Sequence, residues 1–316
     1  MLLLSSVFAT FIPTPFCTPA VKPTMPASAV QQHIPELWHS ADVAGADTYN
    51  GPWGTERAPD PKATYTFVHG KTHGVSPGMT VRDPHGVEWS VKEGEEGPVE
   101  VTVSRVLSAV GYHQPPVYFL PTFSLRDEKG RTHIAGGGRF RPHDKTLKDL
   151  GEWSWQQNPF VDTKPYQGLL VILMMFESSD LKNSNNSLYE LKEPREGAAH
   201  WYVVRDIGTS LGETGRLDPK RNDPEIFERR KFISGLHGQY VEFSYHGWHQ
   251  ELFRDRITAD DVRWASVLLG KLSDHQWADA FRAGQYDSDV AQRFIARLKE
   301  KIAEGRSLEQ SSPSAR

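Results

Sequence analysis

The chain has 316 residues, of which 38% are hydrophobic, and its formal net charge at pH 7 is −4. This length can bury one large core or two lobes, while the negative charge and the lack of a long basic run argue against nucleic-acid binding as the main activity. The mean hydropathy of −0.54 and the lack of a long apolar stretch exclude an internal membrane span. A single cysteine, Cys17, rules out an intramolecular disulfide framework and a cysteine-based zinc site.

Residues 1–29 form a leader with two interpretations. An apolar run from Leu2 to Ile12 has the length of a signal-peptide core, and Ala27-Ser28-Ala29 offers a cleavage site of small residues. However, no Lys or Arg precedes the run, and the prolines between residues 13 and 26 are also typical of a disordered tail. We favour a signal peptide, and with it a secreted or periplasmic protein, over a disordered leader on a cytoplasmic protein.

A mostly antiparallel β region is predicted after a Pro/Gly-rich N-terminal extension at residues 30–63. Alternating apolar and polar residues predict three strands, at 64–68, 79–82 and 87–92. The turn sequence at 127–130 predicts a hairpin between strands at 117–120 and 132–135. Arg139 and Arg141 follow and are either phosphate ligands or solvated surface residues.

One helix interrupts these strands. Pro98 is a favourable first helical residue, Gly111 a favourable end, and Val103, Val106, Leu107 and Val110 recur on one face between them. Glu100 borders this buried face, whereas Glu95 and Glu96 are expected in the preceding turn. We therefore assign residues 64–145 to a small first lobe that contains one important helix.

The second half of the chain, residues 146–305, is predicted to be mainly helical. Amphipathic segments indicate helices at 225–232, 258–269, 274–281 and 288–302, with a disordered tail at 306–316. Before these helices, an apolar run from Leu169 to Phe176 must be buried, and it ends in a polar loop at 178–186. A second apolar strand, 201–204, leads directly to Asp206-Ile207-Gly208.

The acidic and amide side chains at the ends of these buried elements are candidates for catalysis and metal binding. Asp180 could serve as a base, and Asn185 together with Asp206 could supply oxygen ligands to a hard cation such as Mg²⁺. Phosphoryl transfer requires these parts, because its catalysis consists mainly of positioning and charge neutralisation.

These residues resemble the motifs of the protein-kinase-like superfamily. Asp180-Leu181-Lys182-x-x-Asn185 resembles the family's D-L-K-x-x-N catalytic loop, and Asp206-Ile207-Gly208 resembles its D-F-G. Lys92 ends a predicted strand, as does the lysine of the family's V-A-I-K. The usual His-Arg before the catalytic aspartate is replaced by Ser178-Ser179, as in atypical members such as lipid kinases, HipA-type kinases and secretory-pathway kinases.

The resemblance implies an α+β, bilobal protein-kinase-like fold with ATP and Mg²⁺ (or Mn²⁺) bound between a β lobe and a larger helical lobe. It implies that Lys92 contacts the nucleotide phosphates and that Glu100 orients Lys92. Asp180 would be the base for the acceptor hydroxyl and Lys182 a γ-phosphate contact. Asn185 and Asp206 would hold the metal.

Several alternatives remain open at this stage. The chain lacks the glycine-rich G-x-G-x-x-G signature, and residues 73–78, which occupy its place, are equally consistent with a plain hairpin connection. The protein is therefore a kinase-like phosphotransferase, a pseudokinase-like nucleotide-binding module, or a secreted ligand-binding domain with coincidental motifs. The acceptor (protein, lipid or small molecule) is not identified. His246 and His249 are not in an H-E-x-x-H pattern, so zinc binding there is disfavoured.

Overall fold

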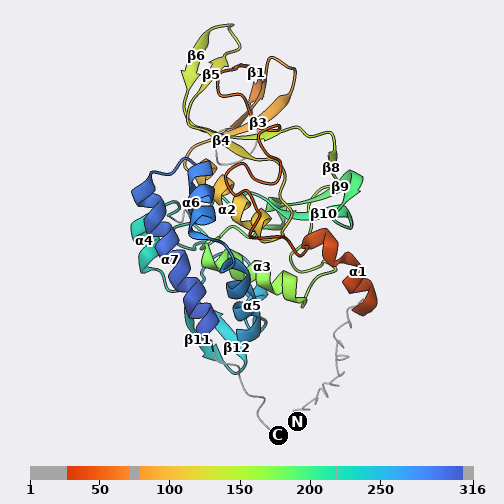
Figure 1. Ribbon diagram of the computed structural model, residues 1–316, viewed down its shortest axis with the longest axis vertical. Helices are drawn as coiled ribbons and strands as arrows, with labels where there is room; N and C mark the ends of the chain where they lie inside the picture. The colour runs from red at the N-terminus through yellow and green to blue at the C-terminus, as the bar shows by residue number, and fades with distance from the viewer. Residues whose placement is uncertain (1–26, 71–77, 218–219, 309–316) are drawn as a thin grey trace, which may run out of the picture.

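The strands of the first lobe form a seven-stranded sheet in the computed structural model, which describes residues 27–70, 78–217 and 220–308 (Figure 1). The strand order is β4-β7-β3-β2-β1-β5-β6, and every pair is antiparallel except β1 with β5. The sheet has its own core, which includes Tyr65, Val91, Phe123 and Phe140. The strands are β1 (Thr64–Gly70), β2 (Gly78–Arg82), β3 (Glu88–Glu93), β4 (Tyr118–Leu120), β5 (Phe123–Arg126), β6 (Thr132–Ala135) and β7 (Gly138–Pro142).

The predicted hairpin around residues 127–130 has a different first strand. Its partners are β5 and β6, with Phe123 opposite Ala135 and Arg126 opposite Thr132. The predicted strand at 117–120 instead pairs with β7 at the far edge of the sheet. The prediction was wrong because it passed over the strand directly before the turn, Phe123–Arg126, which also alternates buried and less buried residues.

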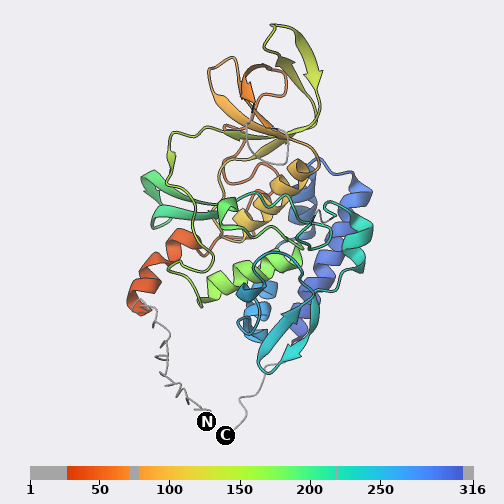
Figure 2. The same ribbon diagram turned by 180° about the vertical axis from the view of Figure 1, so that it is seen from behind.

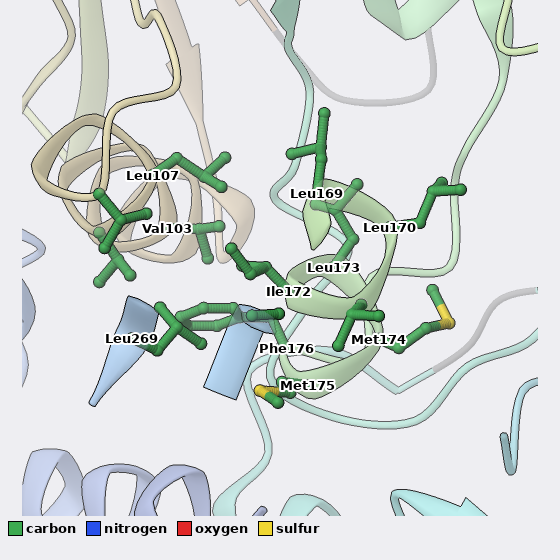
Figure 3. Packing of buried hydrophobic residues seen from close by; sticks show 14 of the residues in the cluster. Val103, Leu107, Leu169, Leu170, Ile172, Leu173, Met174, Met175, Phe176 and Leu269 are labelled. Carbon is green, nitrogen blue, oxygen red and sulfur yellow. The ribbon is translucent and has the colours of Figure 1, made fainter. Parts of the chain in front are cut away.

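Helix α2 (Glu96–Ala109) joins the sheet to the helical lobe. In both views it lies between the seven-stranded sheet and helix α3 (Lys164–Met175) (Figures 1 and 2). Val103 and Leu107 of α2 gather with the apolar residues of α3 and with Leu269 in one cluster (Figure 3). The run predicted to be buried at 169–176 is therefore the centre of the second core and is helical.

The remaining helices cover this core. Helices α5 and α6 each begin with a capping box, formed by Thr258 with Asp261 and by Ser273 with Gln276, which satisfies backbone N–H groups at the helix start. Two smaller sheets complete the fold, with strand order β10-β9-β8 and the pair β11-β12. The elements are β8 (Leu147–Asp149), β9 (Asn186–Arg195), β10 (Ala198–Val204), α4 (Pro224–Arg229), β11 (Ile233–His237), β12 (Tyr240–Phe243), α5 (Ala259–Leu269), α6 (Asp274–Ala283) and α7 (Ser288–Ser307).

The α+β, two-lobed architecture expected from the sequence is confirmed, with a mostly antiparallel lobe, one helix beneath it and a helical lobe. Four details differ from expectation or go untested. The extension begins with an unpredicted helix, α1 (Ala27–Leu37), and α7 continues to Ser307, past the predicted start of the tail. The leader before residue 27 and most of the segment 73–78 lie outside the described residues. Within the described residues, no helix combines the length and apolarity needed to cross a bilayer.

Candidate functional site

The polar loop after α3 is fixed by contacts with residues 245–248. The carbonyl oxygen of Ser179 accepts hydrogen bonds from the Tyr245 hydroxyl at 3.1 Å and from the Trp248 backbone N–H at 3.1 Å. Gly247 lies so close that a Cβ there would be 2.6 Å from the same carbonyl oxygen. The segment 245–248 therefore fixes the backbone directly before Asp180.

Asp180, Lys182 and Asn185 contact one another within this loop. The Asn185 side-chain Nδ2 donates a 2.6 Å hydrogen bond to the backbone carbonyl of Asp180. The Lys182 Nζ lies 2.9 Å from Oδ1 of Asp180 and 5.1 Å from the ring centre of Trp248. The loop thus holds the Asp180 carboxylate beside the Lys182 ammonium group. The side-chain amide of Asn185 fixes the loop backbone through its hydrogen bond to the Asp180 carbonyl.

The hairpin of β9 and β10 brings Asn185 beside Asp206. Asn186 at the start of β9 pairs with Val204 at the end of β10, and the next rung is the 2.8 Å hydrogen bond from the Arg205 N–H to the Asn185 carbonyl. Residues at the same end of an antiparallel pair are neighbours in space. Asp206 has a φ of +49°, a conformation that non-glycine residues adopt rarely and that aspartate adopts more readily than most.

Lys92 reaches the same place from the sheet. It is the penultimate residue of β3, and its Nζ lies 3.2 Å from Oδ1 of Asp206. Its second partner is Glu96, at 2.5 Å, which also pairs with Arg221. The predicted pairing of Lys92 with Glu100 is therefore corrected to Glu96. Helix α2 begins at Glu96, two residues before the predicted start, so Glu96 stands on its first turn facing Lys92.

Glu100 has a different place. Its Oε1 lies 2.5 Å from the Arg141 guanidinium and 3.2 Å from that of Arg139, and the side chains of Glu100 and Arg139 are both only 2% exposed. The two arginines, for which phosphate contact was one interpretation, are therefore occupied inside the protein by Glu100. The buried ion pairs of Glu100 with Arg139 and Arg141 therefore link α2 to β7. Their charges also influence the pKa values of Lys92 and Asp206 without direct contact.

The charges at the site keep Lys92 and its partners ionised. Burial alone would lower the pKa of Lys92, but the surrounding carboxylates, above all Asp206, outweigh it and raise this pKa. Burial alone would raise the pKa of Asp206, but Lys92 and the nearby arginines lower it to about 2. The pKa of Glu96 is also lowered, because Lys92 and Arg221 outweigh the effect of burial. The ion pair therefore persists at neutral pH and is lost only as the pH falls through the lowered pKa of Asp206.

The donor set fits a hard cation beside phosphate. The Nδ2 of Asn185 donates a hydrogen bond to the Asp180 carbonyl, so its Oδ1 is the atom that can coordinate a metal. The Asp206 side chain is 46% exposed and can therefore be reached by a ligand. Carboxylate and amide oxygens are ligands that Mg²⁺ and Mn²⁺ prefer. Gly208 permits the close packing of this segment on α2, since a Cβ there would be 2.6 Å from the Glu96 Cβ.

Five of the six predicted site residues thus form two contacting groups, Asp180 with Lys182 and Asn185, and Lys92 with Asp206. The hydrogen bond from the Arg205 N–H to the Asn185 carbonyl links the two groups, and the sixth residue, Glu100, is buried against Arg139 and Arg141. Sequence reasoning missed Glu96 and Arg221. For Glu96 the available signal was its closeness to Lys92 in the sequence, across the short connection from β3 to α2, whereas nothing local marks Arg221 as its partner.

Comparisons with known proteins add a likeness in structure. No protein-family model matches the chain, and no curated protein is significantly similar to it. Among solved structures, the crystal structure of the proinflammatory kinase CtkA from Helicobacter pylori is similar, with a TM-score of 0.45 and 9% sequence identity, over 79% of this chain and 100% of that chain. At that TM-score and identity, function has to be inferred from the contacts of the site itself.

Proposed function

We propose that this protein is a kinase-like phosphotransferase that uses ATP with Mg²⁺ or Mn²⁺, and that Asp180 activates the acceptor hydroxyl. The observation that carries this proposal is the contact between Lys92 and Asp206, at 3.2 Å, on two elements far apart in the sequence. Short motifs recur by chance, but chance matches do not converge in space in the order that the reaction needs. The hydrogen bond from Arg205 to Asn185 extends the same cluster to the loop of Asp180.

In this proposal, Lys92 binds the phosphates of the nucleotide. Its side chain is 12% exposed, and its ammonium group is held between Glu96 and Asp206, so its position is fixed before a ligand arrives. Bound Mg-ATP supplies the γ-phosphoryl group and a metal that neutralises its charge. Asn185 and Asp206 would provide two oxygen ligands for that metal.

Asp180 is placed to orient the acceptor and to take its proton. The hydrogen bond from Asn185 to the Asp180 carbonyl fixes the backbone without using the carboxylate. Lys182 lies beside the carboxylate and would contact the γ-phosphate, which keeps positive charge where the transferred group is most negative. The acceptor remains a protein, a lipid or a small molecule with a hydroxyl group.

The test of this proposal is the transfer of labelled γ-phosphate by the full chain, with Mg²⁺, to components of a lysate or periplasmic extract. Wild-type protein should transfer label, and Glu96→Gln should transfer up to about 10²-fold less, because Lys92 loses the carboxylate that positions it. Glu93→Gln is the matched control, since Glu93 adjoins Lys92 on β3 and alternation directs its side chain to the other face.

Each other outcome selects an alternative. Binding of Mg-ATP without transfer to any acceptor or to water would make the protein a pseudokinase-like module. A wild-type protein that does not bind Mg-ATP would make the motifs coincidental. If Glu96→Gln and Glu93→Gln both transfer like wild type, Glu96 is not the residue that positions Lys92.

A further inference from the structure

Two histidines and a glutamate from three separate segments meet away from the kinase-like site. His39 follows helix α1, His113 follows helix α2, and Glu196 lies in the turn between β9 and β10. Oε2 of Glu196 is 3.2 Å from Nδ1 of His39 and 3.5 Å from Nδ1 of His113. Among the described residues, these three side chains offer donor atoms that all lie within 4.8 Å of one another.

His113 is oriented as a metal ligand is. Its Nε2 lies 2.7 Å from the carbonyl oxygen of Pro35, which can only accept, so Nε2 carries the proton. The Nδ1 of the neutral ring therefore directs a lone pair at the Glu196 carboxylate, which itself carries only lone pairs. The ring is stacked on Trp201 at 4.6 Å, and its side chain is 1% exposed, so burying a second proton and its charge there would be costly. A cation bound between the His113 Nδ1 and the Glu196 carboxylate would accept both lone pairs and so relieve their repulsion.

His39 adds a second unsatisfied nitrogen to the same point. Its Nδ1 is buried and makes no hydrogen bond, although Glu196 is near. Its backbone is fixed, because its N–H donates to the Gly111 carbonyl at 3.1 Å. Gly111 approaches so closely that a Cβ there would be 2.1 Å from the His39 carbonyl oxygen. The backbone contacts between His39 and Gly111 therefore hold the His39 ring near Glu196.

We propose that His39, His113 and Glu196 bind a divalent transition metal, with Zn²⁺ the expected ion. Two imidazoles with one carboxylate are a common zinc ligand set, and a water molecule can complete four-coordination. Ligands about 2.0–2.1 Å from a tetrahedral zinc lie about 3.3 Å from one another, close to the 3.2 and 3.5 Å observed here. Glu196 is 48% exposed and His39 25% exposed, so both can adjust, and the Pro35 carbonyl supplies the outer partner that zinc-bound histidines usually have.

The metal would fasten the N-terminal extension to the rest of the protein. His39 belongs to the extension, whereas His113 and Glu196 belong to the two lobes. The extension is already joined here by apolar and polar contacts: Leu37 is part of the main core, and Trp38 packs against Trp264 and donates a 2.8 Å hydrogen bond to the Val110 carbonyl. A ligand bond from each segment would stabilise this junction, because a metal that binds only the folded state stabilises it.

The test uses the full chain without an affinity tag, treated with a chelator and then titrated with Co²⁺ as a spectroscopic probe for Zn²⁺. Wild-type protein should bind one Co²⁺ per chain with the visible absorption of a four-coordinate site, and Zn²⁺ should displace it. Glu196→Gln should weaken Co²⁺ binding at least about 100-fold, since the loss of an outer partner alone costs about 10–100-fold. His39→Gln should do the same.

Glu36→Gln is the matched control, because Glu36 lies between His33 and His200 at 2.8 and 3.0 Å, in a second His-Glu group nearby. It should bind Co²⁺ like wild type. Far-ultraviolet circular dichroism would confirm that each variant is folded, and Glu196, in an exposed turn, is the safest position to change. Binding of less than one Co²⁺ per wild-type chain, or equal binding by Glu196→Gln, would show that the three residues are only ion-paired neighbours.

Discussion

Replacement of Asp180 by asparagine should lower phosphoryl transfer by a factor of about 10²–10⁴, the contribution of a general base. Binding of Mg-ATP should be unchanged, because the metal donors Asn185 and Asp206 remain. Folding should also be little affected, since the contact from Asn185 is to the Asp180 backbone and survives the substitution. The partly exposed ion pair with Lys182 contributes only about 0–1 kcal/mol to stability.

The measurement is single-turnover transfer of labelled phosphate at saturating Mg-ATP, together with the nucleotide affinity. Asp255→Asn is a suitable control, because Asp255 is an exposed aspartate paired with His237 away from the site. Wild-type turnover by Asp180→Asn would remove Asp180 from its role as base. A parallel loss of turnover and of Mg-ATP binding would instead place Asp180 among the nucleotide ligands.

Replacement of Lys301 by methionine should destabilise the folded protein by about 3–5 kcal/mol, the cost of breaking a buried ion pair. Lys301 is fully buried on α7, and its Nζ lies 2.8 Å from Oε1 of Glu177 and 3.0 Å from the Met175 carbonyl. Glu177 comes directly before the loop that holds Asp180. Without Lys301 its carboxylate would be buried 3.8 Å from its next cation, Arg230.

The double variant Glu177→Met/Lys301→Met should recover most of that loss. Burial lowers the pKa of Lys301 to about 8 although Glu177 opposes it, so the cost of burying the charge exceeds the attraction within the pair. Two apolar side chains of similar volume avoid that cost. Urea unfolding of the wild type, the single variant and the double variant measures these differences. A double variant as unstable as Lys301→Met would mean that the pair itself, rather than the uncompensated charge, sets the stability.

The parts of the site that were predictable are those that depend on nearby residues. Asn185 and Asp206 were expected at the ends of buried elements close in the sequence, although the hairpin of β9 and β10 that brings these ends together was not predicted. The apolar run from Leu169 to Phe176 marks a buried element regardless of whether it is a helix or a strand. Lys92 could be placed at the end of a strand by alternation alone.

The parts that were not predictable depend on contacts between distant segments. The choice between Glu96 and Glu100 turned on where α2 begins, and Pro98 indicated a start two residues too late. The structural reason for Glu100 is its contact with Arg139 and Arg141 on β7, which no local pattern reveals. Similarly, α1 contains Pro35 and a polar sequence, and its position depends on partners such as His113.

The most direct test of the central claim, that Lys92, Asn185 and Asp206 form a Mg-ATP site, is a thermal unfolding measurement with ATP in the presence and absence of Mg²⁺. The wild type should be stabilised only when both are present, by about 2.7 kcal/mol when the ligand is at 100 times its Kd. Asp206→Ala should lose this metal-dependent shift, because it removes the carboxylate donor while Lys92 keeps Glu96. An Asp206→Ala protein that keeps the full metal-dependent shift would contradict the account.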